Sequence, residues 1–174
     1  AGDSRTGHLH HDAGGFVLDW AGKRWVHMYG RTPGGTSAGT VYSWPNYQQK
    51  TLIGGRYQYY HTRAEANNTI IANPQQNKVD MNLNYVTHLE RHGSSESKAF
   101  GIINMTDTNK DYISSMRGFM LTNNRKTLII QDEIQANKPS EYYWFMNTYA
   151  DITLAPDGKS ALLERKGKTM LVRI

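Results

Sequence analysis

Four ionisable side chains gather near the start of the chain, within residues 7–16: His8, His10, His11 and Asp12. In an extended segment alternate side chains point the same way, so His8, His10 and Asp12 would share one face. Neutral imidazole accepts protons near pH 7 and is also a common metal ligand. The spacing therefore predicts an acid–base pair or a metal site, and a solvated histidine-rich terminus is the alternative that the residues leave open.

A second cluster occupies residues 56–63, where the sequence reads Arg-Tyr-Gln-Tyr-Tyr-His-Thr-Arg. If this run is a strand, Arg56 and Tyr60 lie on one face and Arg63 on the other. Because arginine pairs with carboxylates and aromatic rings stack on sugars, these three residues are candidates for binding a carboxylated sugar. A cross-strand aromatic ladder is the structural alternative. Trp44, in a loop rich in glycine and proline, is a further candidate.

The elements that must position these side chains are predicted to be strands. Residues 16–20 and 24–29 flank a Gly-Lys turn and indicate a hairpin, and residues 127–134 are predicted to form a buried strand. Short strands at spacings of about 8–12 residues favour a β-sandwich. We therefore expect an all-β, antiparallel β-sandwich that forms a single domain over residues 1–174. The other expected strands are 56–63, 68–72, 79–90, 99–104, 113–121, 142–149, 151–154, 161–166 and 169–174.

Composition narrows the classes of partner. The 174 residues are 38% hydrophobic and 20% charged, which is typical of a soluble globular protein. No apolar run approaches the roughly 20 residues needed to span a bilayer, so no membrane association is expected. The net charge of +5 favours polyanions such as nucleic acid or acidic glycans. The net charge and scattered arginine and tyrosine residues are the only features that favour nucleic acid, so we do not expect it as a partner. The absence of cysteine excludes disulfides and thiolate metal sites.

Taken in order, several segments resemble the C-terminal sheet domain of heparinase II/III-like polysaccharide lyases. Residues 8–19 resemble the family's His-x-His-x-Asp-x-Gly-x-Phe segment, and residues 22–25 resemble the turn that follows it. Residues 63–69 are similar to a segment that usually ends in His-Asn-Thr. The resemblance runs from about residue 7 to the C-terminus, and its later part is carried by Thr106-Asp107, Tyr112, Met116-Arg117-Gly118, Leu128–Ile134 and Trp144.

The resemblance implies an enzyme that cleaves uronic-acid polysaccharides, such as glycosaminoglycans or alginate, by β-elimination. Such lyases join an N-terminal α-helical toroid to this sandwich, bind the acidic polysaccharide between the two, and are secreted or periplasmic. His8 matches the family's catalytic histidine, and His10 matches its first metal-ligand histidine. This chain does not include the toroid, so we expect little or no lyase activity from these 174 residues alone.

Three positions depart from the family pattern. Met28 stands where the family has a ligand Asp, Asn67 where it has a ligand His, and Asn147 where a later His-Thr pair usually begins. A divalent metal such as zinc or calcium is implied by the resemblance, but a thioether and an amide are poor ligands for it. These departures favour a second hypothesis, a non-catalytic carbohydrate-binding or structural β-sandwich that has lost the metal site and catalysis.

Overall fold

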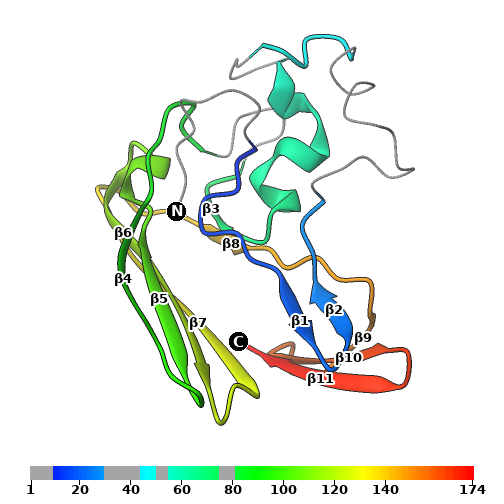
Figure 1. The fold of residues 1–174 in the computed structure, drawn as a ribbon. Coiled ribbons are helices and arrows are strands. Elements are labelled where there is room, and N and C mark those ends of the chain that lie inside the picture. The colour runs from blue at the N-terminus through cyan, green and yellow to red at the C-terminus, as the bar shows by residue number, and fades with distance from the viewer. Residues whose placement is uncertain (1–9, 30–43, 50–54, 75–80) are drawn as a thin grey trace.

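The computed structural model describes residues 10–29, 44–49, 55–74 and 81–174 of the chain (Figure 1). Throughout these ranges the regular elements are strands and short 3-10 helices, without any α-helix, so the predicted all-β class is confirmed. The 3-10 helices are η1 (Arg56–Gln58), η2 (Tyr60–Thr62), η3 (Ala64–Ala66) and η4 (Thr106–Thr108). The strands are β1 (Leu18–Trp20), β2 (Lys23–Val26), β3 (Ile70–Ala72), β4 (His88–Ser94), β5 (Ala99–Asn104), β6 (Tyr112–Thr122), β7 (Thr127–Ala136), β8 (Tyr142–Trp144), β9 (Asp151–Leu154), β10 (Ser160–Arg165) and β11 (Lys168–Arg173).

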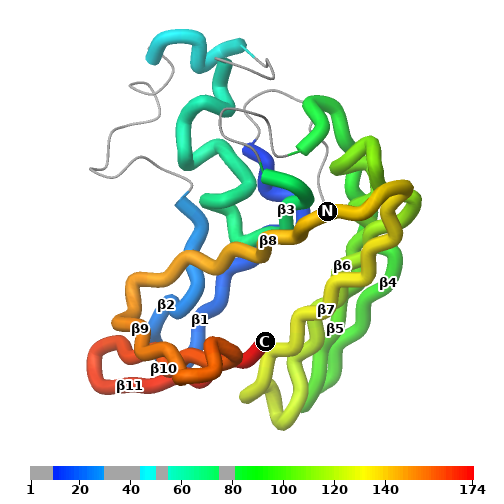
Figure 2. The backbone as a smooth tube through the Cα atoms, turned by 180° about the vertical axis from the view of Figure 1, so that it is seen from behind, coloured from blue at the N-terminus to red at the C-terminus, as the bar shows by residue number. Residues whose placement is uncertain are grey.

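All strand pairs are antiparallel and fall into four sheets: β1-β2, β3-β8, β4-β5-β6-β7 and β11-β10-β9. The four-stranded sheet lies along one side of the molecule, and the β1-β2 hairpin with the three-stranded sheet lies along the other (Figures 1 and 2). The β3-β8 pair lies between these two sides, beneath η1–η3. These three 3-10 helices therefore cover one end of the molecule, whereas η4 contacts β6.

The hairpin of β6 and β7 is the longest strand pairing, and it corrects one expectation about the chain. Residues 127–134 were expected to form a buried strand. Instead, β7 runs to Ala136 and alternates exposed with half-buried side chains, so only one face is covered. Asp132 lies in mid-strand opposite Arg117, because an ion pair across the strands holds it on the covered face.

Residues 56–63 do not form the expected strand. They form η1 and η2, in which Tyr59 N–H donates to Arg56 O (3.2 Å) and Thr62 N–H donates to Tyr59 O (3.1 Å). The hydroxyl of Thr62 also donates to Arg56 O (2.8 Å) and Tyr59 O (2.7 Å). Such local bonds from a threonine side chain compete with strand pairing. The faces expected from strand alternation therefore do not exist here.

Several other predicted strands are shorter than expected: those over 16–20, 24–29 and 68–72 become β1, β2 and β3, and two more change further. Of the strand predicted over residues 79–90, the described part (81–90) pairs in a sheet only at its end, as part of β4. Within residues 142–149 only β8 belongs to a sheet. After β8 the chain leaves the sheet, because Asn147 N–H donates to Asn68 Oδ1 (2.7 Å) rather than to a neighbouring strand.

The core consists of two clusters. One packs Trp25 and Val26 of β2 against Leu163 of β10 and so joins the hairpin to the three-stranded sheet. The other surrounds Ile71 and Met105 beneath the 3-10 helices. Trp25 is fully buried, as expected of a core tryptophan. By contrast, Trp20 (42% exposed) and Trp144 (37% exposed) lie at the surface.

Arg117 is fully buried and links the four-stranded sheet to the rest of the fold. Its guanidinium forms two bonds with Asp132, from Nε to Oδ1 (2.6 Å) and from Nη2 to Oδ2 (2.8 Å). Nη1 donates to Gly14 O (2.9 Å) and Asn68 O (3.3 Å), and approaches Thr69 Oγ1 at 3.4 Å. A buried guanidinium is tolerated when all its donors have partners, so Arg117 fixes the position of the loops that carry Gly14 and Asn68.

Replacing Arg117 with alanine is expected to lower the free energy of unfolding by about 3–5 kcal/mol, because Asp132 and two buried carbonyl groups would lose their hydrogen-bond donor. Urea unfolding followed by circular dichroism measures this loss. Arg24→Ala is the matched control, since Arg24 makes the same two-bond pair with Asp19 at the surface, where both side chains are about half exposed. Equal stability of the Arg117 variant and the wild type would contradict the role given to Arg117.

Candidate functional site

Two histidines that are 51 positions apart in the sequence meet beside the 3-10 helices. The rings of His10 and His61 lie edge to face, with centroids 5.6 Å apart. Tyr47 stacks parallel to His61 at 5.9 Å, and its hydroxyl is 3.4 Å from His61 Nε2. Trp44 and Tyr59 complete the group, with Trp44 4.8 Å from Tyr59 and 5.8 Å from His61. These five residues are called the histidine–tyrosine cluster below.

Backbone bonds set the geometry of this cluster. The segment carrying His10 is fastened to η2 where His11 N–H donates to Thr62 O (2.9 Å). The turn that carries Trp44 and Tyr47 is fastened to η1, because Arg56 N–H donates to Gln49 O (2.8 Å) and Arg56 Nε donates to Tyr47 O (3.0 Å). The cluster thus assembles from three separate segments.

Burial makes the two imidazoles of the cluster neutral bases. The pKa of His10 falls to about 4, chiefly through burial and further through the nearby charges of His61 and Arg56. Burial also lowers the pKa of His61. Near pH 7 both rings are therefore uncharged, and their lowered pKa values make them weaker bases than a free imidazole. With a tyrosine hydroxyl beside His61, the cluster holds the two kinds of group that acid–base catalysis uses.

The predicted sugar-binding residues are placed differently from one another. Trp44 belongs to the histidine–tyrosine cluster, whereas Tyr60 is 50% exposed and its hydroxyl donates to Asn147 Oδ1 (3.4 Å). Arg56 is buried beneath Tyr47, with its guanidinium carbon 5.1 Å from that ring. Arg63 is half-buried and pairs with Glu65 (2.8 Å). They do not form one surface, and their part in sugar binding stays a prediction.

His8, the predicted catalytic residue, lies outside the described residues. Sequence reasoning did not single out His61 and Tyr47 as partners of His10. Both residue types can take part in acid–base chemistry, but a strand over residues 56–63 gave no reason to expect His61 near His10. Only the 3-10 turns and the contact of residues 44–47 bring these side chains together.

The residues at the implied metal site do not fit zinc. Met28 and Asn67 both border Gly15, where an added Cβ would lie 3.1 Å from Met28 Cε and 2.4 Å from Asn67 O. The amide nitrogen of Asn67 donates to Arg63 O (2.6 Å), and its Oδ1 is buried without a partner. Within the described ranges no three His, Cys, Asp or Glu side chains gather in a way that could hold a metal ion. One imidazole with a thioether and an amide is a poor set of donors, so we derive no step through a metal.

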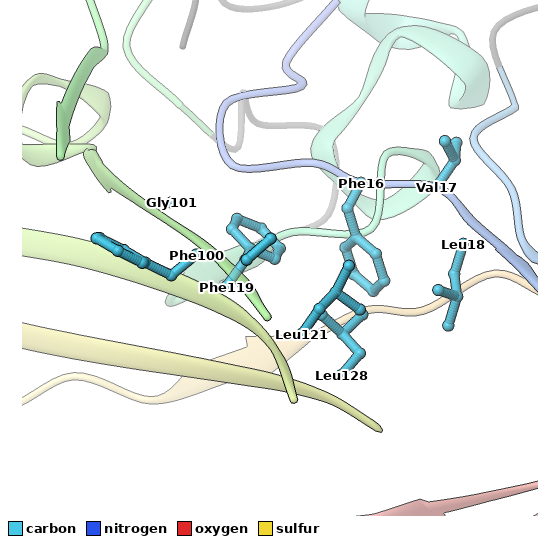
Figure 3. Close-up of a pocket in the computed structure, with 9 residues that line it drawn as sticks. Phe16, Val17, Leu18, Phe100, Gly101, Phe119, Leu121 and Leu128 are labelled. Atoms are coloured by element: carbon cyan, nitrogen blue, oxygen red, sulfur yellow. The ribbon is translucent and has the colours of Figure 1, made fainter. Parts of the chain in front are cut away.

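A cavity of about 200 Å³ opens between β1 and the four-stranded sheet (Figure 3). Its walls are apolar, and the rings of Phe16 and Phe119 lie 5.8 Å apart within it. None of the predicted site residues lines it; the lining residues are Phe16, Val17, Leu18, Ala99, Phe100, Gly101, Phe119, Leu121 and Leu128. The cavity thus offers apolar contact but no acid–base group.

Comparison with known proteins assigns no family to the chain. No family model matches it, and no curated protein is significantly similar to it. Among the residues that the structure describes, no helix is long and apolar enough to cross a membrane. The site must therefore be interpreted from its own geometry.

His11, next to the cluster, is fully buried. Its ring stacks on Tyr57 with centroids 3.7 Å apart. Neither ring nitrogen has a hydrogen-bond partner, and burial lowers the pKa of His11 to about 3. The segment from His10 to Gly14 is a turn and not a strand, so the alternation expected for His8, His10 and Asp12 does not apply to its described part.

Acidification is therefore expected to destabilise the fold. The pKa values of His10 (about 4) and His11 (about 3) in the folded chain lie below the ordinary 6.5, so between these values the unfolded chain binds protons that the folded chain excludes. Their stabilising contribution is complete above about pH 6.5 and decreases as the pH falls, by up to about 1.4 kcal/mol per pH unit for each proton.

Denaturant unfolding at about pH 7 and about pH 5 measures this dependence on protonation. His11→Phe keeps the ring stack with Tyr57 but removes one titrating group. The stability of this variant should therefore decrease less between about pH 7 and about pH 5 than that of the wild type. His88→Gln is the control, since His88 is exposed on β4 and is not one of the two buried histidines. A wild-type stability that does not decrease between the two pH values would contradict the buried, neutral state of these histidines.

Proposed function

We propose that this chain is the C-terminal β-sandwich part of a polysaccharide lyase that cleaves uronic-acid polysaccharides by β-elimination. The observation that carries the proposal is the histidine–tyrosine cluster, in which neutral imidazoles and a tyrosine hydroxyl meet beside Trp44. The cluster includes His10, which is two residues from His8, the position that resembles the family's catalytic histidine. In this proposal the four-stranded and three-stranded sheets are the two layers of the sandwich.

The chemistry of β-elimination suits these groups. A proton next to a carboxylate is weakly acidic, so a base must remove it while positive charge or hydrogen-bond donors neutralise the carboxylate. We assign the base to His8. His10 and His61 then provide uncharged polar side chains beside the substrate, and the hydroxyl of Tyr47 lies 3.4 Å from His61 Nε2. Trp44 is half-buried and offers a ring on which a sugar can stack. The remaining catalytic groups would come from a helical domain, as in the lyases that the sequence resembles.

The proposed substrate is an acidic polysaccharide, of the glycosaminoglycan or alginate class, encountered outside the cell or in the periplasm. The net charge of +5 supports a polyanionic partner. Arg56 adds buried positive charge next to His10, which favours a carboxylate near the cluster. Neither nucleic acid nor a membrane is part of the proposal.

A non-catalytic carbohydrate-binding or structural sandwich is the second candidate, and the amides at the departing positions favour it. Asn147 Nδ2 donates to Glu65 O (3.0 Å) and Asn68 Oδ1 (3.0 Å), and Asn67 Nδ2 donates to Arg63 O (2.6 Å). These two side chains therefore hold backbone segments together. A domain that has exchanged a metal-ligand histidine and a later histidine for such structural amides can retain glycan binding without turnover.

Incubating the full-length gene product with a panel of alginate and glycosaminoglycans distinguishes the two candidates. The lyase proposal predicts unsaturated uronate products, seen as rising near-ultraviolet absorbance, and a large loss of rate in His8→Ala. His88→Ala serves as the matched histidine control and should keep the rate. Binding that survives His8→Ala without any product formation would instead support the non-catalytic candidate. Neither binding nor product across the panel would overturn both.

A further inference from the structure

A second group of aromatic rings contacts the opposite side of the segment that carries the histidine–tyrosine cluster. Tyr60 lies between Tyr59 and His61 in the chain, yet its ring contacts Tyr29, with centroids 5.8 Å apart. Tyr29 in turn lies 4.6 Å from His27 and 6.2 Å from Tyr149. The rings of His27, Tyr29, Tyr60 and Tyr149 are called the Tyr149 platform below.

Three segments are bonded together to build this platform. His27 N–H donates to Asn147 O (3.1 Å), which places the end of β2 beside the chain that follows β8. Tyr29 N–H donates to Ala66 O (3.1 Å), which places the same segment beside η3. Figure 2 shows the chain after β8 passing below the 3-10 helices toward β9. The platform is therefore part of the folded framework, since each of its segments is held by backbone bonds.

Tyr149 is the exposed member of the platform. One face of its ring stacks on His27, with centroids 3.7 Å apart and planes 11° from parallel. Even so, 62% of the Tyr149 surface is open to solvent. A large aromatic ring that is supported on one face and exposed to solvent elsewhere can stack on a flat ligand face, such as that of a pyranose ring.

His27 beneath Tyr149 has polar atoms that the protein does not satisfy. It is 5% exposed, and neither ring nitrogen has a hydrogen-bond partner. Buried polar atoms in folded proteins nearly always have partners. Because Tyr149 covers His27, a ligand on the open face of Tyr149 would not contact these nitrogens, and the role of His27 here is to support the Tyr149 ring.

Positive charge lies over the same ring. The guanidinium carbon of Arg165 is 5.4 Å from the centre of Tyr149, and Arg165 Nη1 donates to Arg24 O (2.5 Å). Arg24 is neutralised by Asp19, whereas Arg165 has no acidic partner within the described residues. An unpaired guanidinium next to an open aromatic ring favours a ligand that combines an apolar face with a carboxylate.

We propose that Tyr149 and Arg165 form a saccharide subsite in which a uronate ring stacks on Tyr149 and its carboxylate pairs with Arg165. The inference rests on the proposed function, because it assumes that the chain meets an acidic glycan. It extends that function to a region separate from the histidine–tyrosine cluster. Through Tyr60, which joins the platform directly after Tyr59 of the cluster, the two regions lie along one chain segment, as expected for neighbouring sugar units of one polysaccharide.

Calorimetric titration of the chain with alginate and heparan sulfate oligosaccharides tests the subsite. Tyr149→Ala is expected to weaken binding about tenfold, which is the usual scale for one lost stacking ring, and Tyr149→Phe should bind as the wild type does. Arg165→Gln should weaken binding by a similar factor and reduce its dependence on salt, since one carboxylate contact is lost. The matched controls are Tyr143→Ala and Arg173→Gln, because both residues are exposed on strands away from the platform.

The outcomes separate the subsite from the wider proposal. If the wild type binds an oligosaccharide, and Tyr149→Ala and Arg165→Gln bind it equally well, the subsite is refuted while the proposed function stands. If the wild-type chain binds no oligosaccharide, the subsite is refuted, whereas the proposed function is decided by product formation with the full-length gene product. Weaker binding by the controls to the same degree would also refute the subsite, since the effect would then be general. If Tyr149→Ala fails to fold, Arg165→Gln and Tyr149→Phe still decide the question.

Discussion

The fold depends on one buried cation. Arg117 takes its position from the pairing of β6 with β7, where Asp132 lies directly opposite it and neutralises its charge. The donors that remain after this pairing point away from the sheet, toward Gly14 O and Asn68 O. A guanidinium without solvent must have partners for its donors, so the sheet cannot form in this register without also fixing those two loops.

Asn68 extends this constraint to the other side of the molecule. Its side-chain nitrogen donates to Phe16 O and His27 O, both at 2.8 Å, and its Oδ1 accepts from the backbone and side chain of Asn147. The path from Arg117 through Asn68 thus reaches both regions to which we assign function. Gly14 lies four residues after His10, and His27 and Asn147 hold the Tyr149 platform. Side chains that perform chemistry or bind ligands need such a rigid frame.

Local patterns predicted the strands well where turns define them. The ranges expected for β5 and β9 match the structure, and the hairpins at Gly22 and Gly158 form with φ of 71° and 67°, a conformation that glycine adopts readily. The prediction for residues 56–63 was wrong because the alternation of side chains carries no information about the bonds of the Thr62 hydroxyl to Arg56 O and Tyr59 O. Local propensity is easily overridden by such side-chain bonds.

The candidate site was only partly predictable. His10 was recognised from its spacing with His8, but its partners His61 and Tyr47 come from distant segments, and no local pattern pairs them. The same holds for Arg117 and Asp132, whose pairing follows from the strand register. Tyr149 and Arg165 were unremarkable in sequence, because their contact exists only once β10 and the segment after β8 are both placed.

The central claim is that neutral histidines near residue 10 form a site for an acidic glycan, and nuclear magnetic resonance of the imidazole rings tests it most directly. With side-chain assignments in hand, alginate and heparan sulfate oligosaccharides are added to the chain at about pH 7, where an unperturbed histidine is already mostly neutral. The account predicts that His10 and His61 are neutral and that their signals shift on binding. Binding that leaves both signals unchanged, or imidazoles that are protonated at this pH, would contradict the account.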